Sequence, residues 1–279
     1  MKNNLKENVV IFSDLDGTAL ASNHDYSDLT LETVKKVYES GHYFIPITAR
    51  STKDAVFQQG IKLGMDKMGG IVIANNGTHI YDFKEEKFIR ALYISNEMLK
   101  KIFDETYGKI GKYKVHYFSD QTTYVYGYGE NSKYWSDVMQ MEYKKIDSFE
   151  DIHEPVNHLT IILAENADDK TREEFYKEFE FVKDELSIIQ YTERVFELST
   201  KGINKGEALT ATLKHLGLNE QNTSVFCFGD GVNDVQMFEQ AEHPIAMQNA
   251  IDEVKKVAQE VTLSNDENGV ARFILDNIL

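Results

Sequence analysis

The sequence predicts an α/β protein whose parallel β-sheet is interrupted by an inserted α+β segment. Strand-like and helix-like stretches alternate over residues 1–82 and again over residues 195–279, which indicates parallel βαβ units. Residues 83–194 differ in texture and are rich in aromatic side chains. Two predicted strands also end in carboxylates, at the edge where open α/β sheets bind their ligands. We therefore expect a core domain from residues 1–82 and 195–279, and an inserted domain at residues 83–194.

The N-terminal part of the core is predicted to run strand, helix, strand, helix, strand. Residues 9–13 form an apolar, β-branched run typical of a buried strand, and residues 31–38 carry apolar side chains at helical spacing. Further strands are expected at residues 42–47 and 71–74, separated by a helix over residues 51–59. An Asn-Asn-Gly turn then leads into a hairpin strand at residues 79–83.

The inserted segment is expected to contain an antiparallel sheet. It holds a strand-like run at residues 158–164 and a helix-like stretch at about 168–182, and beyond residue 195 the core resumes as helix, strand, helix, strand, helix. Tyr124, Tyr126 and Tyr128 alternate and so lie on one face of a strand. That face either packs on the helices of the segment or lines a pocket. Other aromatic residues of the segment are Tyr113, Tyr117, Phe118, Tyr134 and Trp135.

The charge, the cysteine content and the hydrophobic runs of the sequence exclude several classes of binding partner and of cellular location. A formal net charge of −16 argues against a nucleic acid or an anionic membrane, because both need a basic surface opposite them. The single cysteine, Cys227, cannot form an intramolecular disulfide and lies in an apolar run, so we expect a buried, inert thiol. The first residues lack the apolar stretch of a signal peptide, and no run is long enough to span a bilayer. We expect a cytoplasmic protein.

Two pairs of acidic residues follow predicted strands. Asp14 and Asp16 come directly after the run at residues 9–13, and Asp230 and Asp234 follow a second apolar run at residues 224–228. Carboxylates that close together repel one another, and a bound divalent cation is the commonest reason for their proximity. Hard oxygen ligands favour Mg²⁺. The sequence thus predicts a metal site that forms when the two strands come together.

Four short segments, taken in order, resemble the motifs of the haloacid dehalogenase-like phosphatases: DLDGT at 14–18, ITAR at 47–50, GINKG at 202–206 and GDGVND at 229–234. AMQNA at 246–250 and the residues from 261 to 271 resemble the Cof-type branch, subfamily IIB. The resemblance extends from about residue 9 to the C-terminus, with the middle third matched only in position and size. It implies a Rossmann-like parallel-sheet core with an inserted α+β cap of the C2B type that sets substrate specificity.

The resemblance also implies catalytic roles for two aspartates. Asp14 would be the nucleophile that forms an aspartyl-phosphate, and Asp16 would be the general acid and base, with its side chain directed away from the metal. Mg²⁺ would be held by Asp14, the main-chain carbonyl of Asp16 and Asp230, with Asp234 lying behind these ligands or binding the ion through water.

The phosphate-binding residues implied by the resemblance are Leu15, Thr48, Ala49, Lys205 and Asn233. Thr48 ends a predicted strand before a helix, where a hydroxyl and backbone N–H groups can hold an anion. Ala49 replaces the glycine common at this position. Asn233 could equally cap a helix. Arg50 either reaches the substrate or forms a surface ion pair.

The predicted function is Mg²⁺-dependent hydrolysis of a small phosphomonoester, with sugar phosphates as the leading substrate class. Nucleotide, flavin and pyridoxal phosphates remain open as substrates. The alternatives are a phosphohexomutase of the same fold and a non-catalytic regulatory protein that binds a phosphorylated metabolite. The expected partner is a small phosphate ester, with no nucleic acid and no membrane. The expected oligomeric state is a monomer or a weak homodimer.

Overall fold

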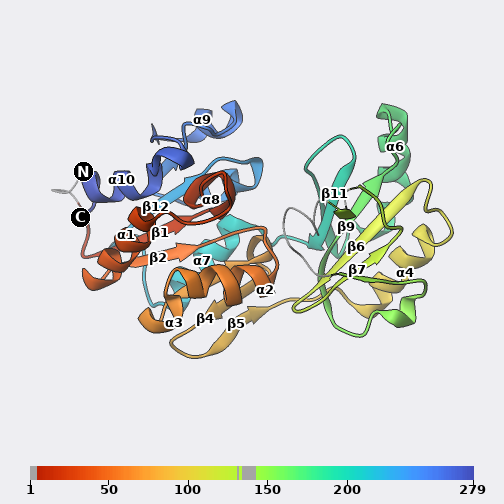
Figure 1. Cartoon of the computed structure of the whole chain (residues 1–279), viewed down its shortest axis with the longest axis horizontal. Coiled ribbons are helices and arrows are strands. Elements are labelled where there is room, and N and C mark those ends of the chain that lie inside the picture. Colours follow the sequence, from red (N-terminus) through yellow and green to blue (C-terminus); the bar gives the residue numbers. More distant parts are fainter. Residues whose placement is uncertain (1–4, 131, 134–142) are drawn as a thin grey trace. The chain divides into compact units, whose positions relative to one another are not determined.

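A computed structural model describes residues 5–130, 132–133 and 143–279 of the chain (Figure 1). The chain divides into two compact units, which we call the core unit (Met1–Arg90 and Ile203–Leu279) and the inserted unit (Ala91–Gly202). The first four residues, Tyr134 and Trp135 lie outside the described residues. Within the described ranges, no helix combines the length and the apolar character that a membrane span requires.

The described part of the core unit contains a five-stranded parallel sheet: β1 (Asn8–Ser13), β2 (Tyr43–Pro46), β12 (Thr223–Gly229), β13 (His243–Ala246) and β14 (Glu260–Val261). The strand order is β14-β13-β12-β1-β2, and every pair is parallel. β1 pairs with β12 in a register that places Ser13 opposite Phe228. The predicted parallel α/β core is confirmed, and the ends of the two acid-bearing strands are neighbours.

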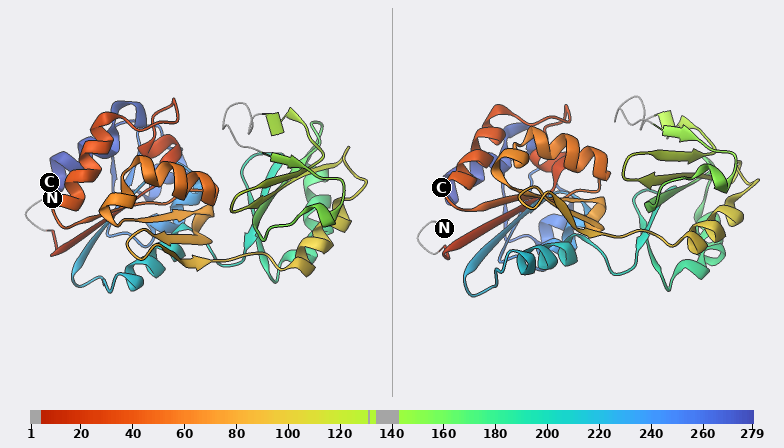
Figure 2. Two further views of the ribbon diagram at one scale, coloured as in Figure 1. Left: turned by 60° about the horizontal axis from the view of Figure 1, so that its bottom comes forward. Right: turned by 90° about the horizontal axis from the view of Figure 1, so that it is seen from below.

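Helices flank this sheet (Figure 2). α1 (Asp28–Glu39) packs against α10 (Gly269–Asn277) on one side, and α7 (Lys205–His215) lies on the other side and contacts α8 (Val235–Phe238). Ser27 caps α1, since its side chain accepts a hydrogen bond from the Thr30 N–H at 3.1 Å. The predicted helix at residues 51–59 is a short α2 (Thr52–Asp54) that continues as a wider π-type helix, η3 (Ala55–Gly60). Two further helices are α3 (Met65–Met68) and α9 (Asp252–Val257).

A smaller three-stranded sheet extends the core unit, in the order β3-β4-β5. β3 (Ile71–Ala74) and β4 (His79–Asp82) are antiparallel, which confirms the predicted hairpin, and β5 (Lys87–Ala91) follows. A single parallel bridge between Ile47 and Ile73 connects β3 to the residue after β2.

The inserted unit has its own sheet and its own core. Over its described residues, the strand order is β10-β11-β9-β6-β7-β8, with antiparallel pairs except for β7 and β8. Tyr124 and Tyr126 are buried in one apolar cluster with Tyr117 and Phe175, which supports their packing role over a pocket role. The elements are α4 (Asn96–Thr106), β6 (Tyr113–Ser119), β7 (Thr123–Tyr126), β8 (Tyr143–Lys145), β9 (Val156–Leu163), α6 (Asp169–Glu178), β10 (Leu186–Gln190) and β11 (Val195–Thr200), with short 3₁₀ turns at Phe149–Asp151 and Glu180–Val182.

The structure places both crossing points between the units later than the predicted boundaries at residues 82/83 and 194/195. β5 belongs to the core unit because it extends the β3–β4 hairpin. β11 belongs to the inserted unit because it pairs with both β9 and β10, so residue 195 begins a strand there and not a core helix. The predicted helix at residues 168–182 is also shorter, since Phe179 turns into the apolar cluster after α6 ends.

Gly206 in the first turn of α7 permits a close approach to the segment that follows Asp234. A Cβ atom at this position would overlap the backbone carbonyl of Gln236 in α8. We expect Gly206→Ala to lower the free energy of unfolding by about 1–3 kcal/mol, because an added methyl forces the two helices apart. Urea denaturation would measure this. The matched control is Gly111→Ala, where nothing lies within 4 Å of the added Cβ. Equal midpoints for the two variants would contradict the predicted overlap.

Candidate functional site

The ends of β1 and β12 hold the two acidic segments together. The backbone N–H of Asp14 donates to the Phe228 carbonyl at 3.0 Å, which extends the parallel ladder to the first acidic residue. The Thr18 hydroxyl donates to Asp230 at 2.9 Å. Gly17 has a φ of +74°, and a Cβ there would overlap the Asp230 carboxylate. A glycine is therefore required for the loop after Asp14 to turn and approach Asp230 this closely.

Three carboxylates converge at this edge of the sheet. Asp14, Asp230 and Asp234 each offer an oxygen atom, and these atoms lie within 4.8 Å of one another. Lys205, whose side chain is fully buried, donates to one oxygen of Asp14 and one of Asp234, both at 2.6 Å. The lysine therefore joins the start of α7 to the ends of both acid-bearing strands.

Asp234 is occupied on both oxygen atoms. One oxygen binds Lys205, and the other accepts hydrogen bonds from the backbone N–H groups of Asp230 and Gly231, both at 2.9 Å. These bonds shape the turn that carries Asp230. In this geometry Asp234 fixes the lysine and the loop, while Asp14 and Asp230 retain oxygen atoms that are free of such backbone bonds.

Negative charge exceeds positive charge in this cluster. Burial raises the pKa of Asp14 well above its usual value, even though Lys205 acts against the shift, and Asp234 and Asp230 add to it. Burial, followed by the charge of Asp234, raises the pKa of Asp230 to about 6. Burial lowers the pKa of Lys205, but the charges of Asp14 and Asp234 outweigh this effect and raise the pKa above its ordinary value. The lysine therefore stays protonated. Hard, anionic oxygen donors with excess negative charge fit a cation such as Mg²⁺.

Asp16 lies outside the three-carboxylate group and pairs with Arg50 instead. The Arg50 Nε donates to one oxygen of Asp16 at 2.7 Å and its Nη2 donates to the other at 2.6 Å, a bidentate pair. Arg50 also donates to Asp54 at 2.8 Å. Burial tends to raise the pKa of Asp16, but the Arg50 bonds outweigh it and hold this pKa below the usual value. His24 lies 3.3 Å from the same carboxylate.

The two sequence-based alternatives for Arg50 were contact with substrate and a surface ion pair. The structure shows an ion pair, but not one on the surface, since the Arg50 side chain is only 9% exposed. An arginine buried against Asp16 controls the orientation and the charge of that carboxylate.

The remaining predicted residues form a third group. Thr48 is buried two residues after the end of β2, and its hydroxyl accepts a hydrogen bond from the Arg50 N–H at 3.1 Å. The Asn233 side chain donates to Asn76 at 3.0 Å, and the Asn76 N–H donates to the Thr48 carbonyl at 2.9 Å. Leu15 is fully buried, and Ala49 is partly buried.

Several residues of these networks were not singled out from the sequence. Thr18 is part of the DLDGT segment. Asp54 lies in α2, four residues after Arg50, which precedes the helix. Asn76 lies in the Asn-Asn-Gly turn, which the sequence indicates only as a turn. Asn249, in the AMQNA segment, donates to the Gly17 carbonyl at 2.7 Å and so holds the loop after Asp14.

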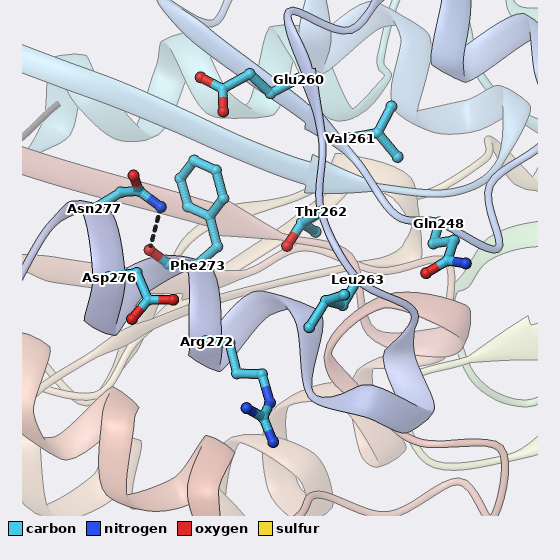
Figure 3. A pocket seen from close by; sticks show the side chains of 9 residues that line it. All are labelled: Gln248, Glu260, Val261, Thr262, Leu263, Arg272, Phe273, Asp276 and Asn277. Carbon is cyan, nitrogen blue, oxygen red and sulfur yellow. Dashed lines mark hydrogen bonds between the residues drawn. The ribbon is translucent and has the colours of Figure 1, made fainter.

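Two other features share no residue with these networks. Asp82, Glu85 and His215 offer ligand atoms within 4.8 Å of one another, but Asp82 already accepts from two backbone N–H groups and faces His215 at 2.9 Å. A hollow of about 450 Å³ lies beside α10 and β14 (Figure 3). It is lined by Gln248, Glu260, Val261, Thr262, Leu263, Arg272, Phe273, Asp276 and Asn277.

The fold and the site define an α/β protein with a Rossmann-like core, an inserted α+β unit and an acidic cluster at the carboxyl ends of adjacent parallel strands. The sequence profile of the haloacid dehalogenase-like hydrolases matches residues 11–274, and the chain belongs to this family. The 5-amino-6-(5-phospho-D-ribitylamino)uracil phosphatase YwtE of Bacillus subtilis (strain 168) is 30% identical over 280 residues, which cover 94% of this chain and 95% of the relative.

Two further comparisons agree. Phosphatase YwpJ of the same organism is 28% identical over 296 residues, which cover 95% of this chain and 98% of the relative. The crystal structure of a haloacid dehalogenase-like hydrolase from Bacteroides thetaiotaomicron shares the fold, with a TM-score of 0.84 at 24% identity over 96% of this chain and 99% of that chain. The protein is thus a phosphatase that hydrolyses phosphoric monoesters, as the sequence predicted. Phosphatases of this family generally use a divalent metal.

The raised pKa of Asp230 makes the stability of the metal-free protein depend on pH. A carboxyl whose pKa is about 6 when folded and 3.8 when unfolded binds more protons in the folded state between these values. Asp230 therefore contributes to the free energy of unfolding below about pH 4, and this contribution is lost as the pH rises through about 6. Its upper limit is about 3 kcal/mol.

We expect Asp230→Asn to remove the part of the fall in stability between about pH 4 and pH 6 that the Asp230 carboxyl causes. Thermal unfolding in EDTA at pH 4.5 and pH 7 would show a smaller destabilisation on raising the pH for Asp230→Asn than for wild type. Asp66→Asn, at an exposed carboxylate of α3, is the control and should behave as wild type. Identical pH dependence of wild type and Asp230→Asn would contradict the charge balance described for the cluster.

Proposed function

We propose that the protein is a Mg²⁺-dependent phosphatase that hydrolyses small phosphomonoesters through phosphorylated Asp14, with sugar phosphates as the leading substrate class. The observation that carries this proposal is the buried Asp14 carboxylate, held by Lys205 at 2.6 Å and grouped with Asp230. One oxygen of Asp14 is fixed by the lysine, and the other remains for attack on phosphorus.

Asp14, Asp230 and the main-chain carbonyl of Asp16 would hold the Mg²⁺ ion, with Asp234 behind them. When bound, the ion supplies positive charge that neutralises the carboxylates and the phosphoryl group. Lys205 would contribute the same kind of stabilisation, because its ammonium group lies against the nucleophile. Thr48, the backbone near Leu15 and Ala49, and Asn233 would donate hydrogen bonds to the phosphoryl oxygens.

The reaction proceeds in two displacements. In the first, an oxygen of Asp14 attacks phosphorus, the bond from phosphorus to the ester oxygen breaks, and Asp16 gives its proton to the departing alkoxide. In the second, water attacks the phosphorus of the aspartyl-phosphate while Asp16 takes a proton from that water. The products are the alcohol, inorganic phosphate and regenerated Asp14.

Asp16 must leave its pair with Arg50 before it can act as an acid. The Arg50 bonds lower the pKa of Asp16 and so favour the carboxylate over the acid. A bound phosphate dianion offers the guanidinium group an alternative anionic partner and at the same time raises the pKa of Asp16 by charge repulsion. Arg50 would in this way serve both the substrate and the general acid.

The substrate class is supported by the relative that shares 30% identity. Its name gives 5-amino-6-(5-phospho-D-ribitylamino)uracil as its substrate, in which the phosphate esterifies a sugar alcohol. The same compound belongs among the candidates for this protein, beside hexose and pentose phosphates. Substrate selection by the inserted unit and a monomeric or weakly dimeric state remain predictions. A cytoplasmic location is supported by the single cysteine, Cys227, because one cysteine cannot form the intramolecular disulfides common in oxidising compartments.

Asp14→Asn is the direct test. We expect Mg²⁺-dependent phosphate release by wild type from some members of a panel of phosphomonoesters, and a loss on the order of a thousandfold or more in the variant, because the amide is not a nucleophile. Colorimetric phosphate detection, with Mg²⁺ or EDTA, measures both. Asp66→Asn is again the matched control.

Three outcomes would count against the proposal. Wild-type turnover by folded Asp14→Asn would exclude the aspartyl-phosphate route, and equal rates in EDTA would exclude the metal. Transfer of phosphate between sugars without release of inorganic phosphate would identify a mutase. Circular dichroism of the variant must match wild type, and this is expected because the change keeps the shape of the side chain.

A further inference from the structure

The turn between β3 and β4 (η4, Asn75–Gly77) has an unusual backbone. Its three residues have φ values of +50°, +52° and +109°, and all three are buried. Glycine adopts such angles without strain. Asparagine is strained at these angles, although less than most other residues. Two successive asparagines at positive φ therefore indicate that their side chains contribute something that glycine cannot supply.

Asn76 connects two of the predicted phosphate-binding residues. Its backbone N–H donates to the Thr48 carbonyl at 2.9 Å, and its side-chain oxygen accepts from the Asn233 Nδ2 at 3.0 Å. The carboxamide of asparagine has a donor edge and an acceptor edge. An acceptor at Asn76 selects the donor edge of Asn233, and uses one of the two N–H bonds on that nitrogen. The second N–H bond stays available for an anion.

The same turn contacts other segments of the site. The Asn75 N–H donates to the Arg50 carbonyl at 3.0 Å, and its side chain donates to the Thr52 hydroxyl at 2.9 Å. Gly77 lies against the start of α7, where an added Cβ would approach Ala208 to 2.7 Å and the Asn204 carbonyl to 2.9 Å. The turn thus contacts the segments that carry Thr48, Arg50 and Lys205.

We propose that Asn76 is a positioning residue for phosphate binding, which holds the Asn233 amide with its N–H groups toward the phosphoryl site and fixes it relative to Thr48. The inference rests on the proposed function, because it assumes that Asn233 donates to phosphate. Asn76 itself does not touch the substrate. A purely conformational role for Asn76, as a residue that tolerates positive φ, is the competing explanation.

Asn76→Gly separates these explanations, because glycine suits the backbone but has no acceptor. We expect its unfolding midpoint to equal or exceed that of wild type. We expect kcat/KM for the best substrate of the panel to fall roughly tenfold or more, as for loss of one hydrogen bond to a charged group. The dissociation constant of inorganic phosphate, measured by calorimetry with Mg²⁺, should rise by a similar factor. The control is Asn268→Gly, the same change at a φ of +60° in a turn before α10.

A double-mutant cycle with Asn233→Ala tests whether Asn76 acts through Asn233. Once the amide of Asn233 is gone, Asn76→Gly should have little further effect on phosphate affinity or on kcat/KM. Additive effects, or wild-type phosphate affinity in Asn76→Gly, would overturn the inference while leaving the proposed function intact. Failure of the wild-type protein to bind phosphate and to hydrolyse any ester would overturn the proposed function, and this inference with it.

Discussion

The site depends on one buried cation between two carboxylates. Lys205 is fully buried, and removing an ammonium group from water is unfavourable unless anions surround it. Asp14 and Asp234 provide them at 2.6 Å each, and they come from different segments, one after β1 and the other after β12. The ion pairs therefore fix the start of α7 against both strand ends. Loss of Lys205 would leave the buried Asp14 and Asp234 carboxylates without the cation that they share.

Asp14 and Asp16 are two residues apart yet have opposite environments. The pKa of Asp14 is raised by burial among other carboxylates, and the pKa of Asp16 is lowered by Arg50. The proposed reaction needs the reverse, an ionised nucleophile and a protonated acid. Bound ligands would shift both pKa values in the required direction. A cation next to Asp14 would favour its ionised form, and a phosphate dianion next to Asp16 would favour its protonated form. The protonation states suited to catalysis would thus arise only in the complex.

The sequence was sufficient where a local pattern determines the structure. The apolar run before Asp14, the alternation of strands and helices, and the Asn-Asn-Gly hairpin each act over a few residues, and the structure has them as predicted. The sequence was insufficient where the structure depends on a contact between residues that are far apart in the chain. β11 is a short strand whose four central residues are buried, and only its pairing with β9 and β10 assigns it to the inserted unit. The Arg50–Asp16 pair and the Asn76–Asn233 bond join residues that are distant in the chain, so no spacing indicates them.

A protein with a net charge of −16 that acts on anions needs a local source of attraction. Lys205 does not provide it alone, because Asp14 and Asp234 already neutralise it, and Arg50 is likewise paired with Asp16 and Asp54. The carboxylates around Asp14 outnumber the cations that contact them, so a phosphate dianion would be repelled from the site as described. In the proposed mechanism a divalent cation at Asp14 and Asp230 would reverse this balance. Phosphate binding would then be coupled to metal binding by charge, and the acidic cluster would exclude phosphorylated compounds until the metal is in place.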